Sequence, residues 1–388
     1  MIMKKNLFKS LLTMCALGAI FAACSNENEK SVVNNGEKTS AYLQLDLRGK
    51  TRAIETPFGA NAATVTSLQL YFHDGTNVLK TLSVTNSSTP NIAQLQTGVK
   101  ITDIPANATK VTVFGNIPTS VSVPTSGTIA SVKNTIIEIS TQTTASNVLL
   151  RGNDADLALV STYPSPTPPW LSTADGNDKY AEVTIAPAFS RIEIEGIMSD
   201  ATSPITAYKL EGVFLTNIFT ALKLDGTVHG SKETNASDPS KYAQDIVGGT
   251  PQYKSSEDGL LHQWTQTNAT VSGSSYEVTA GIGKVWGFQV VPNDATNGND
   301  QLQIVLRLSS VTATGYTFSG DQFITVRGFK NSADQIIKLE PGKIYSISKA
   351  DFTFDHNNLN AVPVTSAVSV WLKVTVKPWE VVTVKPNL

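Results

Sequence analysis

Residues 41–47 read Ala-Tyr-Leu-Gln-Leu-Asp-Leu, so Leu43, Leu45 and Leu47 alternate with polar residues. Side chains of a strand point in turn to its two faces, and this pattern therefore predicts a strand with one buried face. Comparable runs recur along the chain between clusters of Gly, Pro, Asn, Asp and Ser. They span residues 65–72, 79–84, 111–114, 182–185, 191–197, 212–219, 285–291, 302–308, 323–326 and 344–347. Many short strands joined by turns predict an all-β fold built from β-sandwiches.

Helical spacing is convincing in one segment. Ile129, Val132, Ile136 and Ile139 recur at helix-like intervals, so a minor helix is expected over residues 129–139. Charged residues make up 16% of the chain, while Thr, Ser, Val and Ile abound. This composition favours strands in the rest of the molecule.

The chain of 388 residues is long enough for two domains or three. The expected boundary is the Ala-Pro-Ala sequence at residues 186–188, because proline interrupts a strand ladder and a new alternating run begins at Arg191. We therefore predict a first sandwich at residues 41–187, with the minor helix, and a second at residues 188–388.

The N-terminus has the pattern of an export signal. Three lysines in the first nine residues precede an apolar run, residues 11–23, that is too short to span a bilayer. Small residues stand directly before Cys24, as in the lipobox of bacterial lipoproteins, whose cysteine is acylated. An ordinary signal peptide that happens to contain a cysteine is the alternative. Residues 1–23 are thus the predicted signal peptide, and the polar segment 24–40 is predicted to be a flexible tether.

Cysteine content and charge exclude two classes of protein. Cys15 and Cys24 are the only cysteines, so a processed chain has no disulfide and depends on core burial for its stability. The formal charge of −2 becomes −5 when the three leader lysines are removed. Without a basic stripe or block, nucleic acid is not an expected partner.

Motifs for catalysis or for cofactor binding are missing from the sequence. It contains no H-E-x-x-H or G-x-S-x-G motif, and its histidines are scattered without a cysteine partner. We predict that each histidine is an ordinary strand or turn residue: His73, His229, His262 and His356. The chain is therefore predicted not to be an enzyme and to need no metal and no cofactor.

Three local patterns allow a functional interpretation beside a structural one. Residues 281–283 read Gly-Ile-Gly and, with Gly287, resemble a dinucleotide loop, but strand-like sequence on both sides favours a turn. Residues 293–300 carry oxygen ligands suited to calcium, yet they lack the closing Glu of an EF-hand, and a hairpin turn is favoured. Glu193 and Glu195 share one face of a strand, which describes a solvated edge as readily as a glycosidase pair.

A basic link follows the first predicted strand. Residues 47–53 read Leu-Arg-Gly-Lys-Thr-Arg-Ala, and an exposed flexible link of this kind is where a trypsin-like protease cuts. An ordinary turn with solvated charges is the alternative.

The C-terminus ends in an apolar run, residues 368–388, that Pro378 interrupts. Its apolar positions are Val370, Leu372, Val374, Val376, Trp379, Val381, Val382 and Val384. The residues before Pro378 are predicted to point one way and to form a strand, which resumes after it. A terminal apolar strand needs a sheet to join, and an unpaired one invites association with another chain.

Five segments, taken in order along nearly the whole chain, resemble the fimbrillin family of the Bacteroidales, the FimA/Mfa-type subunits of type V pili. They are the lipobox at Cys24, residues 51–53 (Thr-Arg-Ala), residues 101–105 (Ile-Thr-Asp-Ile-Pro) leading into 111–116 (Val-Thr-Val-Phe-Gly-Asn), residues 188–194 (Ala-Phe-Ser-Arg-Ile-Glu-Ile) and residues 376–382 (Val-Lys-Pro-Trp-Glu-Val-Val). The resemblance implies two transthyretin-like β-sandwiches in tandem and a structural role in a pilus.

The resemblance also implies a maturation route. Precursors of this family are lipoproteins, acylated with chains such as palmitate and carried to the cell outer membrane, where an arginine-specific protease removes the N-terminus with the first strand. Carried onto this chain, cleavage would fall after Arg52 and leave Ala53 as the first residue, with Arg48 as the less favoured alternative. Loss of the strand at residues 41–47 would then open a groove lined by backbone groups and apolar side chains.

A neighbouring subunit is the implied occupant of that groove. Its C-terminal strand would enter by β-augmentation. The expected donor residues are Val374, Val376, Trp379, Val381, Val382 and Val384, and the expected displaced residues are Leu43, Leu45 and Leu47. The implied partners are other copies of the chain or related pilus subunits, the maturation protease, the outer membrane through the lipid, and a host or bacterial surface receptor. The mature form would then belong to an extracellular fimbrium.

Two alternative roles remain open at this point. A tip adhesin of the same pilus would share these features. A surface lipoprotein that binds glycan with its second domain and never polymerises is the alternative from another class, with Trp264 and Trp286 as stacking platforms. An interpretation of both tryptophans as core or interface aromatics is favoured over that role.

Overall fold

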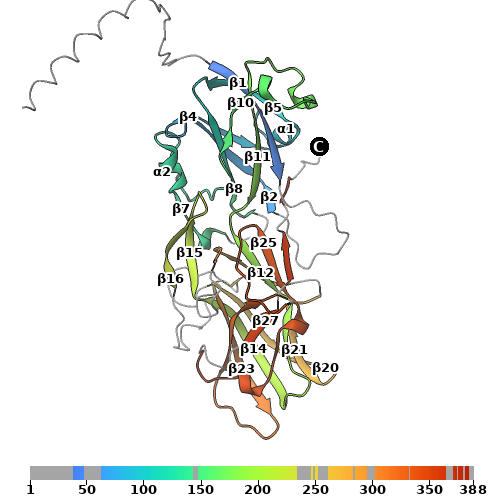
Figure 1. The fold of residues 1–388 in the computed structure, drawn as a ribbon. Coiled ribbons are helices and arrows are strands. Elements are labelled where there is room, and N and C mark those ends of the chain that lie inside the picture. Colours follow the sequence, from blue (N-terminus) through green and yellow to red (C-terminus); the bar gives the residue numbers. More distant parts are fainter. Residues whose placement is uncertain are drawn as a thin grey trace, which may run out of the picture. The chain divides into compact units, whose positions relative to one another are not determined.

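The computed structural model describes the chain from Lys38 to Thr383 with internal gaps. The described residues are 38–47, 63–142, 147–233, 246–247, 250–251, 261–282, 285–294, 302–331, 333–363, 370–373, 375–378 and 381–383. Strands dominate these residues and helices are short, so the predicted all-β fold class is confirmed (Figure 1).

The first part of the chain forms a nine-stranded sheet. Its main order is β4 (Val78–Thr85), β3 (Ser67–His73), β6 (Lys110–Gly115), β8 (Leu150–Gly152), β11 (Lys179–Pro187), β1 (Lys38–Leu47) and β5 (Val99–Pro105). Two short strands lie off this path: β9 (Ala155–Asp156) pairs with β6, and β10 (Ala158–Leu159) pairs with β11. The first strand of the chain is therefore an interior strand of this sheet.

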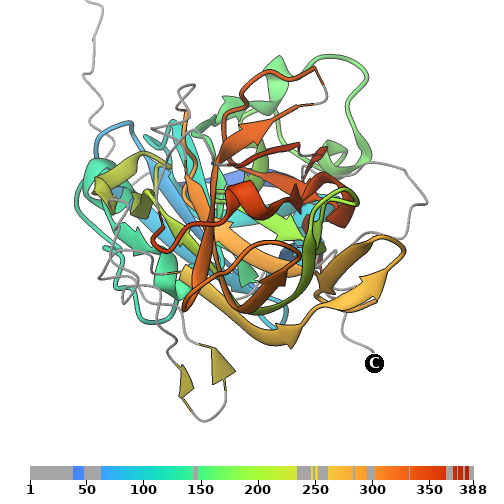
Figure 2. The same cartoon turned by 90° about the horizontal axis from the view of Figure 1, so that it is seen from below.

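The later strands form smaller sheets, which Figures 1 and 2 show from two directions. One sheet has the order β22 (Trp286–Val290), β12 (Ser190–Ile194), β25 (Lys343–Ile347) and β28 (Thr375–Pro378). A second has β20 (Thr270–Ser272), β21 (Ser275–Thr279), β13 (Gly196–Ser199) and β26 (Thr353–Phe354). A third has β19 (Leu261–Asn268), β14 (Ile205–Thr216), β23 (Gln303–Ala313), β24 (Gln322–Lys330) and β27 (Val370–Lys373).

Three further pairings complete the description. The strands β16 (Val228–Glu233), β15 (Ile218–Lys223) and β7 (Ile136–Glu138) form one small sheet. The strand β17 (Ile246–Val247) pairs with β18 (Thr250–Pro251), and β2 (Ala63–Val65) pairs with β29 (Val381–Thr383).

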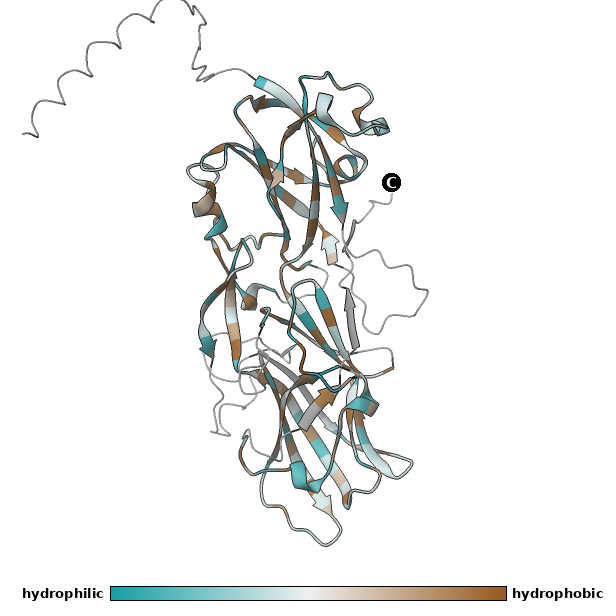
Figure 3. Ribbon diagram, viewed as in Figure 1, coloured by the Kyte–Doolittle hydropathy of each residue, from teal (hydrophilic) through white to brown (hydrophobic). Residues whose placement is uncertain are grey.

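The core follows from the alternation of apolar and polar residues. Apolar and polar segments alternate along many strands (Figure 3), and their inward residues are nearly fully buried, as Leu68, Leu70 and Phe72 of β3 are. Each predicted run corresponds to one strand or two, and three runs are divided. The run 65–72 spans the end of β2 and most of β3, which Thr66 separates. The run 191–197 splits into β12 and β13, and the run 212–219 splits into β14 and β15 at Asn217. Asn217 has φ 55°, a left-handed conformation that a continuous strand does not contain.

The helix predicted over residues 129–139 is wrong in its extent. Helix α2 covers Ile129–Lys133, with the Thr128 side chain as its N-cap, and residues 136–138 form strand β7 against β15. A strand partner thus overrides the helical spacing of Ile136 and Ile139. A second helix, α1 (Ile92–Thr97), was not predicted, although Asn91 and Gln94 form a capping box at its start.

The strand pairing changes near the predicted domain boundary. Strand β11 ends at Pro187 and β12 begins at Ser190. Pairs β7–β15 and β2–β29 nevertheless join earlier strands to later ones, and Glu37–Leu388 form one compact unit. The division into sandwiches at residues 41–187 and 188–388 therefore stays a prediction. No helix in the described part of the chain is long and apolar enough to cross a membrane.

Candidate functional site

Strand β1 lies between two neighbours that it pairs with differently. It runs parallel to β11, from Ala41 opposite Lys179 to Leu47 opposite Ile185, and antiparallel to β5, from Lys38 opposite Pro105 to Leu43 opposite Val99. Residues 41–43 therefore pair on both sides, whereas residues 44–47 pair with β11. Because β5 ends the sheet and pairs there with β1, removal of β1 would separate β5 from the remaining strands.

The inward side chains of β1 belong to the hydrophobic core. Ala41 is 0% exposed, Leu43 1% and Leu45 6%. Gln44 is half-buried and Asp46 is exposed, as the alternating pattern predicts. The backbone of Leu47 pairs with β11, while its side chain lies outside the described residues. Burial of each leucine stabilises the fold by roughly 1.5–3 kcal/mol, so β1 occupies a slot that is costly to leave empty.

The outer face of β1 is covered by an aromatic and charged cluster that sequence analysis missed. Tyr42 is 4% exposed, and the Lys100 ammonium lies 5.3 Å from the centre of its ring. Lys100 also pairs with Asp178 at 3.2 Å, and this hydrogen bond raises the pKa of Lys100 above its ordinary value. Tyr42 lies on β1, Lys100 on β5 and Asp178 directly before β11, and the alternating sequence pattern does not predict that they meet.

Lys179 anchors the beginning of β11 beside this cluster. Its ammonium donates hydrogen bonds to the carbonyl oxygens of Ala106 and Ala108, at 2.7 and 2.5 Å. Burial lowers the pKa of Lys179 below its ordinary value. The ammonium therefore ties the β5–β6 turn to β11 independently of β1.

Helix α1 covers the other end of the strand. The Gln44 side-chain amide donates to the carbonyl oxygen of Gln96 at 3.3 Å, which joins β1 to the last turn of α1. Gly98 follows the helix with φ 91°, and a Cβ placed there would lie 2.5 Å from the Cβ of Trp170. Glycine is thus required for both the backbone turn and the close approach of the tryptophan.

The predicted donor segment is paired with strands of the same chain. Strand β27 runs parallel to β24, β28 runs antiparallel to β25, and β29 runs parallel to β2. The residues predicted to form one strand before Pro378 are therefore divided between two sheets, because β27 and β28 have different partners. Strand β28 ends at Pro378, in agreement with the predicted interruption. Leu372 is 0% exposed.

Several predicted site residues lie outside the described part of the chain. They are Cys24, Arg48, Arg52, Ala53, Val374, Trp379 and Val384. The side chains of Val376, Val381, Val382 and Trp264 are likewise not described, although their backbones lie in strands. Lipidation, cleavage and strand donation at these positions therefore stay predictions.

Two sequence interpretations of polar or aromatic residues can be compared with the structure. The solvated edge predicted for Glu193 is wrong, because Glu193 is 2% exposed and pairs with Arg191 at 2.7 Å. The guanidinium of Arg191 lies over Gly287, where any Cβ would collide with it. Trp286 is 7% exposed and belongs to the core, as the favoured interpretation predicts.

His73 is a buried strand residue. Its Nε2 lies 3.0 Å from the Thr112 hydroxyl, and its Nδ1 accepts a hydrogen bond from the backbone N–H of Gly75. Burial lowers the pKa of His73 below its ordinary value of 6.5. Among the described residues, no group of three or more His, Cys, Asp or Glu side chains could hold a metal ion.

Comparison with solved structures identifies the architecture. A fimbrilin (FimA) from Porphyromonas gingivalis W83 superposes with a TM-score of 0.52 over 89% of this chain and 99% of that chain. The chain has the fold of a fimbrilin. A candidate cell adhesion protein from Bacteroides eggerthii DSM 20697 gives a TM-score of 0.50 over 90% of this chain and 98% of that chain. Sequence identity is 14% in both cases, so the likeness concerns the fold.

Sequence comparison does not extend this result. No family model matches the chain, and no curated protein matches it. The fimbrillin resemblance found in short sequence segments is thus confirmed for the fold.

Proposed function

We propose that the chain is a structural subunit of a pilus, in which a neighbouring copy replaces strand β1. The observation that carries this proposal is the place of β1 at the interior of the first sheet, with Leu43 and Leu45 in the core. A strand near the N-terminus that a protease can detach would leave a slot between β5 and β11. Such a slot exposes main-chain groups on both sides and apolar pockets beneath.

An incoming strand restores both kinds of interaction. Main-chain hydrogen bonds to β11 and β5 set its register, and apolar side chains refill the pockets of Leu43 and Leu45. Each refilled pocket contributes roughly 1.5–3 kcal/mol before the cost of ordering the strand is subtracted. The contact joins different surfaces of two copies and does not close on itself, so it grows a filament.

The C-terminal strands are the proposed donor. Each of them has one neighbour within the described residues: β27 and β28 end their sheets, and β29 pairs with β2 alone. Release of each of these strands breaks the hydrogen bonds to a single neighbouring strand. The segment also carries the apolar residues that would fill the pockets of Leu43 and Leu45. Export as a lipoprotein through Cys24 and cleavage after Arg52 belong to the same proposal, with Arg48 as the alternative site.

Proteolytic activation is the first test. The purified chain is treated with an arginine-specific protease and run on a gel without boiling, where the wild type should give a ladder of polymers. The double variant Arg48→Ala/Arg52→Ala should prevent both cleavage and the ladder, whereas the matched control Arg48→Ala should retain both. A cleaved product that stays strictly monomeric would refute the proposal and would favour a non-polymerising surface lipoprotein.

Removal of the donor is the second test. A variant that lacks residues 379–388 should fold and be cleaved, yet give no ladder. Polymers of unchanged length would rule out the C-terminal donor. Mass spectrometry of the surface-extracted chain distinguishes an acylated Cys24 from a mature N-terminus at Ala53. A tip adhesin would instead be found at filament ends by immunogold labelling.

A further inference from the structure

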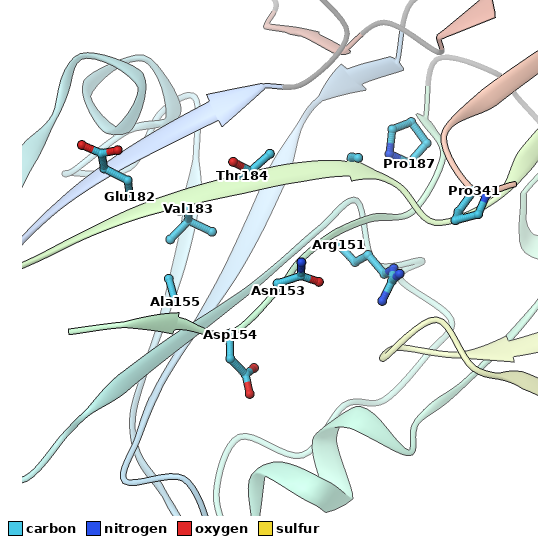
Figure 4. A pocket seen from close by; sticks show the side chains of 10 residues that line it. Arg151, Asn153, Asp154, Ala155, Glu182, Val183, Thr184, Pro187 and Pro341 are labelled. Carbon is cyan, nitrogen blue, oxygen red and sulfur yellow. The ribbon is translucent and has the colours of Figure 1, made fainter. Parts of the chain in front are cut away.

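A hollow of about 330 Å³ lies on the first sheet. Figure 4 shows its lining, which comes chiefly from β8, the turn after it, and β11. Its polar side chains include Arg151, Asn153, Glu182 and Thr184, and its apolar wall includes Val183 and Pro187. The lining therefore combines hydrogen-bonding groups with hydrocarbon surface.

The chain leaves the β11 ladder beside the hollow. Strand β11 pairs with β8 from Gly152 opposite Ile185, and with β10 from Ala158 opposite Tyr180. Between these pairs, residues 153–157 do not pair with β11, and residues 155–156 form β9, which pairs with β6 instead.

The charged groups of the hollow are held by partners outside it. The Arg151 guanidinium donates to the carbonyl oxygen of Asp225, and the Tyr163 hydroxyl donates to Oε1 of Glu182 at 2.9 Å. Asp154 is held by Lys133 at 2.6 Å and by the Thr112 hydroxyl at 2.5 Å. Among the described residues, no hydrogen bond or ion pair joins Arg151 to Glu182, although both line one hollow. Arg151 and Glu182 thus have separate hydrogen-bond partners while both line the hollow.

An aromatic surface adjoins Glu182. Tyr180 lies two residues before Glu182 on the same face of β11, about 7 Å away. The rings of Tyr163 and Tyr180 are 4.8 Å apart and both are half-buried. Aromatic rings beside a polar hollow offer a face for the C–H groups of a second ring of a ligand.

We infer that this hollow binds a neutral saccharide. Sugar hydroxyls both donate and accept hydrogen bonds. They can therefore bond to the guanidinium, amide, hydroxyl and carboxylate groups that line the hollow. The charges of Arg151 and Glu182 balance, and Lys133 neutralises Asp154, so the site favours an uncharged ligand. Its volume lies at the lower end of ligand pockets, which suits a single sugar ring with a second ring over Tyr180.

Titration of the intact purified chain with named sugars tests the inference. The probes are glucose, galactose, mannose and N-acetylglucosamine with their β-linked disaccharides, followed by saturation-transfer NMR and calorimetry. At least one probe should bind, and Glu182→Ala and Asn153→Ala should each weaken it by roughly tenfold. Both residues are exposed, so the variants should keep the thermal unfolding midpoint of the wild type. The matched control Glu138→Ala, an exposed carboxylate on β7, should bind as the wild type does.

A further variant separates positioning from contact. Tyr163→Phe should weaken binding by a few-fold, because Glu182 loses the hydroxyl that holds it, and should have no further effect in the Glu182→Ala background. The inference is overturned if no neutral sugar binds at about 10 mM, if binding is unchanged in both Glu182→Ala and Asn153→Ala, or if sialyllactose or a free amino acid binds and the neutral probes do not.

Discussion

Strand β1 and the C-terminal strands β27–β29 differ in how many neighbours hold them. Strand β1 is an interior strand, paired on both sides at residues 41–43 and carrying Leu43 and Leu45 into the core. The C-terminal strands each pair with one neighbour among the described residues and are spread over three sheets. Both segments are apolar, so hydrophobicity alone does not separate them. The difference teaches that β1, the strand proposed to be removed, is held on two sides, whereas each strand of the proposed donor segment is held on one.

Amide hydrogen exchange gives the largest expected contrast between the two regions. Amides of residues 41–43 should exchange only through global unfolding, whereas those of residues 381–383 should exchange through local opening. We expect protection to differ by at least roughly a thousandfold, which corresponds to about 4 kcal/mol. Exchange measured by NMR or mass spectrometry on the uncleaved chain checks this. Equal protection of the amides of residues 41–43 and 381–383 would contradict the distinction between an interior β1 and an edge β29.

Truncation of a core leucine in β1 should give the next largest effect. Leu43→Ala leaves a cavity between the first sheet and its core, and it should lower the free energy of unfolding by about 2–5 kcal/mol. Urea denaturation measures the change. The matched control Asp46→Ala, on the exposed face of the same strand, should change it by less than about 0.5 kcal/mol. A loss at Leu43 no larger than that at Asp46 would contradict the interior placement of β1.

The exposed ion pair at the start of β1 should give the smallest effect. The hydrogen bond from Lys38 to Asp103, at 3.2 Å, lowers the pKa of Asp103 below its ordinary value of 3.8. A carboxyl group whose pKa is lower in the folded than in the unfolded chain stabilises the fold at pH values above its unfolded pKa. This stabilisation is lost as the pH falls through the folded pKa. The free energy of unfolding of Lys38→Ala should therefore be slightly lower than that of the wild type at neutral pH, and the two should become equal below about pH 3.8. Unfolding curves across pH test this, and a gap that widens in acid would show that the pair is not responsible.

The fold class and the candidate slot could be predicted from the sequence because they depend on period-two alternation. Leu43 and Leu45 face inward and Gln44 and Asp46 outward, and burial enforces this pattern strand by strand. The end of the tether differs, since β1 begins at Lys38 within the segment predicted to be flexible. Lys38 pairs with Pro105, which is distant in the sequence, so no local sequence pattern predicts that the strand begins there.

Other features depended on partners that are distant in the sequence. The segment 136–139 has helical spacing, yet residues 136–138 form a strand, because β15 offers a ladder to pair with. The position of Glu193 on a strand predicted a solvated side chain. Its burial is stabilised by the ion pair with Arg191, whose guanidinium lies over Gly287, and this arrangement exists only when the sheet has formed. The hollow at residues 153–157 lies where the chain leaves β11 and pairs with β6, and no local pattern encodes this change of partner.

By itself, the sequence determined which faces of which strands are apolar, where a basic link and a predicted export signal stand, and that short segments resemble fimbrillins. Only the tertiary structure decided that β1 is interior and that β27–β29 lie at edges, because strand order is set by contacts between residues far apart along the chain. Alternation fixes a face through the local geometry of one strand, whereas the number of neighbours is a property of the whole sheet.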